Sequence, residues 1–206
     1  MVSLAVIPPV LSVVIGVALA SISLVKGRCK KQNILFSLVT ASRSIESATL
    51  RWSDVDLKKG RMVFRNTKNG QDYTFPIAPV ARSILERRLK AKINDFVFGY
   101  ADSGKCHVVC PPQYHIKLVR VECGEHWSMH DLRRTFTTAM TLLNVHAFTI
   151  AHLMKHSMNS SMTLSYAPPT QEQLLEALIR LEQHLLERVR PEACNAAATE
   201  VVGAVA

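Results

Sequence analysis

The 206-residue sequence lacks the cysteine pattern of a secreted, disulfide-linked protein. It has five cysteines, an odd number, and their spacing is loose. A secretory signal peptide is not indicated either, because no positive charge precedes the first apolar stretch. The sequence therefore favours a reducing compartment, and we expect a cytoplasmic protein.

Charge is absent from residues 1–25, and basic residues follow directly between Lys26 and Lys31. An apolar stretch of this length can span a membrane as a helix, with its basic end in the cytoplasm. Pro8 and Pro9 interrupt the helical pattern near its start. Residues 1–31 are therefore a membrane anchor, a buried helix or aberrant sequence from a disrupted gene, and these three alternatives stay open.

Acidic residues are scarce relative to basic ones: 16 Asp and Glu stand against 25 Lys and Arg, giving a formal net charge of +9. This balance favours a polyanionic partner, either a nucleic acid or an anionic membrane surface. The hydrophobic content of 48% is sufficient for a core and excludes a globally disordered chain. The length suits one domain with additional segments.

Hydrophobic periodicity predicts a mainly α protein with one small antiparallel β-sheet near residues 55–77 (an α+β fold). Residues 33–50 predict two short helices, with an apolar stripe at Ile34, Leu35, Leu38 and Val39 and a cap at Ser42 or Ser44. Further helices are predicted over residues 79–93, 112–122, 130–143, 146–155 and 170–190.

Strand signals are concentrated in residues 61–77. The dipeptide Asn69-Gly70 separates two strand-like runs and predicts a β-hairpin, with Lys68 beside its turn. A short strand is predicted over residues 95–98, and the small apolar residues 191–206 predict a disordered tail.

Four short stretches carry residue types that suit phosphate chemistry. They are TASRSIE (residues 40–46), TKNG (67–70), HDLRRTF (130–136), and LMKHS (153–157) followed by TLSYA (163–167). Taken singly, each has a common structural explanation, such as a surface ion pair, an exposed turn lysine or a half-buried tyrosine.

Together and in this order, the stretches resemble the tyrosine recombinase (phage integrase) family, over about residues 33–190. The resemblance implies a catalytic domain at residues 32–190 that cuts and rejoins double-stranded DNA in recombination or integration. It implies that Tyr166 attacks the phosphorus and forms a covalent phosphotyrosyl intermediate. It also places Arg43 and Arg133 on the scissile phosphate, where guanidinium groups provide planar donors that stay charged.

The resemblance assigns the remaining roles as well. His130 acts as general base, His156 donates a hydrogen bond to the phosphate, Lys68 protonates the leaving 5′-oxygen, and Glu46 holds Arg43. No cofactor or metal ion is expected, because the basic side chains supply the electrostatic stabilisation.

The sequence also departs from the family pattern. Ala41 and Lys155 stand where the family usually has glycine, and the spacing from His156 to Tyr166 is one residue longer. Integrases carry a core-binding domain before the catalytic domain, whereas only residues 1–31 precede it here. The alternative functions are therefore a non-catalytic DNA-binding remnant and a membrane-anchored protein whose integrase-like part is inactive.

Two other patterns in the sequence have simpler explanations. Cys106, Cys110, Cys123 and His126 have a spacing that suits zinc, but two prolines and a predicted helix between the pairs favour coincidence. The leucine stripe of residues 170–190 suits the domain core or a neighbouring copy, and the resemblance favours contact between copies, as in a tetramer on DNA.

Overall fold

The computed structural model describes residues 29–67, 70–99, 128–155 and 168–202. Several predictions lie outside these residues: the apolar segment 1–25, the helix 112–122, the cysteine–histidine pattern at 106–126, and Lys68, His156 and Tyr166. The described residues form a mainly helical fold with a three-stranded antiparallel sheet, which confirms the predicted fold class. In the part of the chain that is described, no helix is both long and apolar enough to cross a membrane.

The first two helices are α2 (Cys29–Thr40) and α3 (Ser44–Ala48), as the periodicity predicts. The predicted apolar stripe of α2 is buried, and so is Phe36 on another side of the helix. A helix that is apolar on several sides lies inside a protein, and α2 indeed contacts α3, α4, α6 and α8. The cap at Ser42 or Ser44 is wrong: the N-cap of α3 is Arg43, because the Glu46 carboxylate accepts its backbone N–H at 2.9 Å.

The sheet consists of β1 (Val55–Asp56), β2 (Arg61–Phe64) and β3 (Tyr73–Pro76), in that spatial order. Strands β2 and β3 form the predicted hairpin, with Met62 opposite Phe75 and Phe64 opposite Tyr73. The predicted strand 95–98 is not regular: only Phe96 forms an isolated bridge, to Arg51. The neighbouring backbone instead donates and accepts single hydrogen bonds with residues 50–52.

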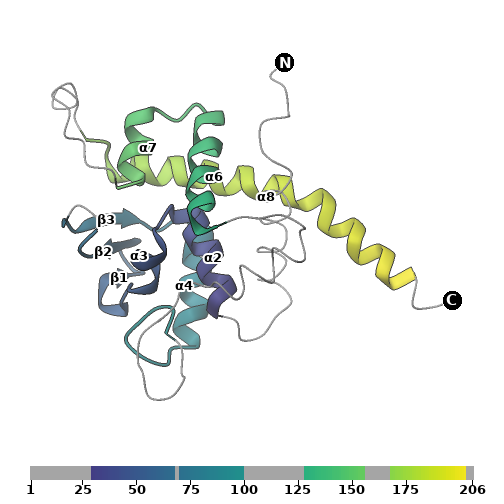
Figure 1. Cartoon of the computed structure of the whole chain (residues 1–206), viewed down its shortest axis with the longest axis horizontal. Helices are drawn as coiled ribbons and strands as arrows, with labels where there is room; N and C mark the ends of the chain where they lie inside the picture. Colours follow the sequence, from purple (N-terminus) through teal and green to yellow (C-terminus); the bar gives the residue numbers. More distant parts are fainter. Residues whose placement is uncertain (1–28, 68–69, 100–127, 156–167, 203–206) are drawn as a thin grey trace.

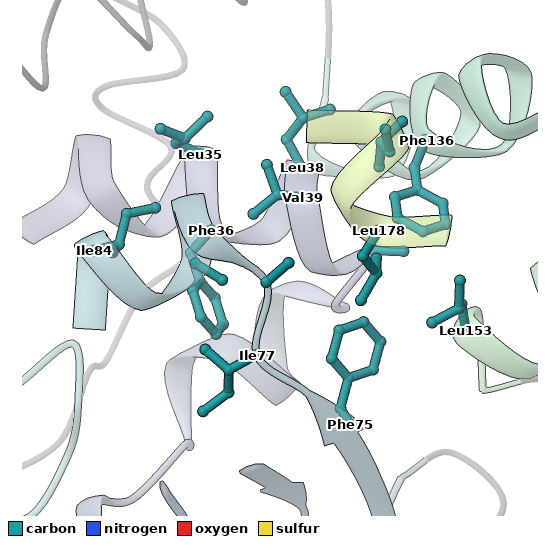
Figure 2. Close-up of a cluster of buried hydrophobic side chains, with 14 of the residues drawn as sticks. Leu35, Phe36, Leu38, Val39, Phe75, Ile77, Ile84, Phe136, Leu153 and Leu178 are labelled. Carbon is teal, nitrogen blue, oxygen red and sulfur yellow. The ribbon is translucent and has the colours of Figure 1, made fainter. Parts of the chain in front are cut away.

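Three more helices follow the predicted pattern: α4 (Pro79–Lys90), α6 (Met129–Leu142) and α7 (Ala147–Leu153). In the core, α2 packs with residues from the sheet and from the other helices. Among them are Phe75, Ile84, Phe136, Leu153 and Leu178 (Figure 2). Phe64 of β2 and Phe75 of β3 meet edge to face with ring centres 5.7 Å apart, and both rings are part of this core.

The last helix, α8, runs from Gln171 to Val202, and its C-terminal part extends away from the rest of the chain (Figure 1). Its end was predicted at residue 190 with a disordered tail beyond, which is wrong for residues 191–202. Four residues of that segment are alanine, the strongest helix former, and they favour a helix after Pro191, which itself disfavours one. The leucines at 174, 178, 181 and 185 are buried in the core of the same chain, so four of the six leucines in residues 170–190 complete the domain.

Candidate functional site

Three of the predicted site residues converge at one place, together with a fourth residue that the motifs do not include. Arg43 is the N-cap of α3 and Glu46 lies in its first turn, Arg133 lies in the second turn of α6, and Lys155 follows the C-cap of α7. We call these four residues the cationic cluster. Their helices meet because α2 and α6 pack together and α3 and α7 flank that pair.

Glu46 is the carboxylate at the centre of the cluster. Its Oε1 accepts Arg43 Nη1 at 2.6 Å, and its Oε2 lies 3.2 Å from Lys155 Nζ. The Glu46 and Lys155 side chains are 3% and 1% exposed, whereas the Arg43 side chain is 24% exposed and so reaches the surface. Glu46 therefore forms ion pairs with both Arg43 and Lys155.

Arg133 ties together the two backbone segments that carry the other cations. Its Nη1 donates to the carbonyl of Ala41, and its Nη2 donates to the carbonyl of Met154 at 3.0 Å. Ala41 lies two residues before Arg43, and Met154 directly precedes Lys155. Because one planar guanidinium group joins both segments, its position and theirs are set together.

Ala41 and Lys155, the two residues that replace a usual glycine, both have left-handed backbone conformations, with φ of +48° and +55°. Each directly follows a helix end, Ala41 after α2 and Lys155 after the C-cap of α7. A left-handed residue at this position commonly ends a helix and is usually glycine, because a Cβ atom is crowded there. The fold thus keeps the backbone geometry that glycine would adopt with less strain.

The cluster carries three cationic groups and one carboxylate among the described residues. Burial lowers the pKa of Lys155 to about 8, although Glu46 opposes this change. Burial and the nearby Arg43 lower the pKa of Arg133 below its ordinary value. Burial alone would raise the pKa of Glu46, but Lys155 and the hydrogen bonds from Arg43 together hold it below the usual value. An excess of buried positive charge is stabilised by a bound anion.

The motifs did not assign a role to Lys155. The sequence signal that could have indicated such a role is a basic residue, next to His156, at a position where the family usually has glycine. Such a residue requires compensation for both the strained backbone and the buried charge. The compensation comes from Glu46 and from two aromatic rings, because Lys155 Nζ lies 4.2 Å from the ring centre of Phe64 and 5.2 Å from that of Phe75.

His130 lies on the first turn of α6, one turn before Arg133, and its side chain is exposed. Asp131 accepts the backbone N–H and the hydroxyl of Ser128, at 2.9 and 2.6 Å, and so fixes the start of this helix. No hydrogen bond or ion pair joins His130 to the cluster within the described ranges.

The structure describes the β2–β3 hairpin up to Thr67 and again from Gly70, on either side of the position of Lys68. Thr67 and Gln71 are joined by a backbone hydrogen bond of 3.1 Å, and Gly70 has a φ of +72°. Lys68, His156 and Tyr166 themselves lie outside the described residues, so their predicted roles stay predictions.

The chain matches known families and proteins. A family model described as "Phage integrase family" matches residues 25–173. The chain is 30% identical over 148 residues to the "Putative integrase/recombinase" of Haemophilus influenzae, covering 70% of this chain and 46% of that protein. It is also 30% identical over 125 residues to prophage integrase IntF of Escherichia coli K12, covering 58% of this chain and 26% of that protein. The chain thus spans less than half the length of these two relatives.

Solved structures share the fold at lower identity. The integrase of mycobacterium phage Brujita superposes with a TM-score of 0.62 at 20% identity, over 92% of this chain and 65% of that one. XerA recombinase superposes with a TM-score of 0.54 at 19% identity, over 82% of this chain and 62% of that one. The family match covers most of the chain and includes the cationic cluster, so the protein belongs to the tyrosine recombinase (phage integrase) family.

Proposed function

We propose that the chain cuts and rejoins double-stranded DNA through a covalent phosphotyrosyl intermediate at Tyr166. The observation that carries this proposal is the cationic cluster, in which Arg43 and Lys155 contact one carboxylate, Arg133 joins the segments that carry them, and Arg43 reaches the surface. A backbone phosphate is an anion whose oxygens suit guanidinium donors. The family membership and the overall charge of +9 support DNA as the source of that phosphate.

In the proposed reaction, the Tyr166 oxygen bonds to the phosphorus and the phosphorus–5′-oxygen bond breaks. His130 accepts the phenol proton, and Lys68 donates a proton to the departing 5′-oxygen. Arg43, Arg133 and His156 stabilise the negative charge that develops on the phosphate oxygens. The reverse steps rejoin DNA without ATP, because the covalent link keeps the energy of the broken bond.

The fold is also compatible with assembly of several copies on DNA, which the resemblance favours through residues 170–190. The four leucines of α8 that are buried in their own domain are not available for that contact. An assembly of this kind would therefore use other surfaces, such as the part of α8 around Leu186, which is 41% exposed.

The experiment is covalent capture on nicked duplexes of randomised sequence, in which a short cut strand diffuses away and prevents rejoining. We expect the wild-type chain to form a detergent-resistant protein–DNA adduct, and sequencing the captured DNA then provides a defined substrate. Tyr166→Phe should form no adduct, because the attacking oxygen is missing. The measurement is the adduct fraction on a denaturing gel.

Tyr73→Phe is the matched control. Its hydroxyl is buried and makes no hydrogen bond within the described residues, so its loss should leave the adduct fraction unchanged. Salt-sensitive DNA binding by the wild type with no adduct under any condition would contradict the proposal and favour a non-catalytic DNA-binding remnant.

A further inference from the structure

Lys155 is buried at a backbone position where a side chain is costly. Its φ is +55°, and its side chain is 1% exposed. Glycine would avoid the backbone strain, and an apolar side chain would avoid the cost of burying a charge. The contacts of the ammonium group must therefore offset both the backbone strain and the cost of burying its charge.

Those partners belong to three different parts of the fold. The ammonium group lies 3.2 Å from Glu46 Oε2 of α3, and it faces the rings of Phe64 on β2 and Phe75 on β3. An ammonium group that faces aromatic rings is attracted by their negative faces. Lys155 is thus fixed between the sheet and Glu46, on the protein side of the cluster.

The position of Lys155 determines how Glu46 meets Arg43. Glu46 Oε2 accepts the backbone N–H of Arg43 at 2.9 Å and faces Lys155, while Oε1 accepts Arg43 Nη1 at 2.6 Å. Without the second cation, Oε2 would keep only the backbone N–H of Arg43, and the carboxylate could then turn to bind the guanidinium group with both oxygens, in the bidentate geometry that arginine prefers. Such binding would draw Arg43 toward Glu46 and away from a ligand at the surface.

We propose that Lys155 is a positioning residue for Arg43: it occupies one oxygen of Glu46 so that the guanidinium group stays available to the DNA phosphate. This inference rests on the proposed function. Lys155 acts through Glu46 and does not touch the DNA, because its ammonium group is enclosed by protein. Lys155 also places a second positive charge beside the Glu46 carboxylate. Without it, Arg43 would be the only cation that contacts this carboxylate.

The test begins with Lys155→Met and Lys155→Gly on the substrate captured by the wild-type chain. Both variants remove the ammonium group, and glycine also suits the left-handed backbone, so at least this variant should fold. We expect the rate of adduct formation at saturating DNA to fall about 10- to 100-fold, because a misplaced catalytic group costs this much. The Kd for DNA should change less than about threefold, because most of the affinity comes from other phosphate contacts.

A double-mutant cycle separates positioning from a general structural role. If Lys155 acts through Arg43, then adding Lys155→Met to Arg43→Ala should lower the rate no further. An equal loss in both backgrounds, or a rate for Lys155→Gly equal to that of the wild type, would overturn the inference. Lys90→Met, which removes an exposed lysine on α4, is the matched control and should leave the rate unchanged.

A measurement without DNA keeps this inference distinct from the proposed function. NMR titration of the Glu46 side-chain carboxyl carbon should show a higher pKa in Lys155→Met than in the wild type, because Lys155 lowers it. An unchanged Glu46 pKa would refute the pairing even if the enzyme is active. If the wild type forms no adduct, the proposed function fails, and this titration still decides whether Lys155 holds Glu46.

Discussion

Arg133→Ala should lose both activity and stability. We expect adduct formation to fall about 100- to 1000-fold, the usual cost of removing a group that stabilises charge in a transition state. The free energy of unfolding should fall by about 2–4 kcal/mol, because the buried carbonyls of Ala41 and Met154 lose their charged donor. Covalent capture measures the first effect, and urea denaturation followed by circular dichroism measures the second.

Arg134→Ala is the matched control, because it removes the neighbouring arginine of the same helix. The Arg134 side chain is 73% exposed and lies 3.5 Å from Asp131 in a surface ion pair, so its loss should change stability by less than about 1 kcal/mol. Arg133→Lys keeps the positive charge but lacks the planar guanidinium group that donates to two carbonyls. This variant should therefore remain impaired in both adduct formation and stability. Full stability of Arg133→Ala would show that this guanidinium group does not join the two segments.

Glu182→Ala should have the largest effect on stability away from the cluster. Glu182 lies on α8 and is 3% exposed, and its oxygens accept the backbone N–H groups of Val80 and Ala81 at 2.9 and 3.2 Å. The N-cap of α4 is Ala78, which has no side-chain acceptor, so Glu182 caps this helix from another element. Leaving two donors unsatisfied should lower the free energy of unfolding by about 2–4 kcal/mol, measured by urea denaturation.

The same residue makes stability depend on pH. Burial raises the pKa of Glu182 to about 7 in the folded chain, and the hydrogen bonds from α4 lower it by less. Because this pKa lies above the ordinary value of 4.5, the stabilising contribution of the protonated group is complete below pH 4.5 and is lost as the pH rises through about 7. Glu182→Gln, which does not titrate, should lack this decline.

The comparison is the difference in unfolding free energy between wild type and Glu182→Gln at pH 5 and pH 8, which cancels other titrating groups. The exposed Glu176 on the same helix provides the control: Glu176→Ala should lower stability by less than about 0.5 kcal/mol. Parallel curves for wild type and Glu182→Gln across this range would contradict a raised pKa.

Local patterns predicted most of the fold. The helices α2, α4, α6 and α7 and the hairpin follow from apolar periodicity, one proline at a helix start and one Asn-Gly turn. The end of α8 was mispredicted because small apolar residues are equally typical of tails and of helices that extend from a domain. The segment 95–98 has strand-like residues, but its backbone pairs only briefly with residues 50–52.

Only the site residues that belong to the sequence motifs were predicted. Arg43, Glu46 and Arg133 converge because two short stretches place them at the start of α3 and on α6. The pairing of Lys155 with Glu46 could not be read from spacing, because it depends on how α7 ends against the sheet. The cap that Glu182 gives to α4 joins residues 102 positions apart, and no local pattern encodes such a contact.

If the cationic cluster binds one DNA phosphate, then a neutral phosphate analogue at that position should make Arg43 far less important. The substrate captured by the wild-type chain is prepared twice, once with its natural scissile phosphate and once with a methylphosphonate at that position. On the natural substrate, Arg43→Ala should slow adduct formation at least about 100-fold. On the uncharged substrate, the same substitution should cost less than about threefold, because the charge that Arg43 stabilises is absent. An equal loss on both substrates would contradict the account.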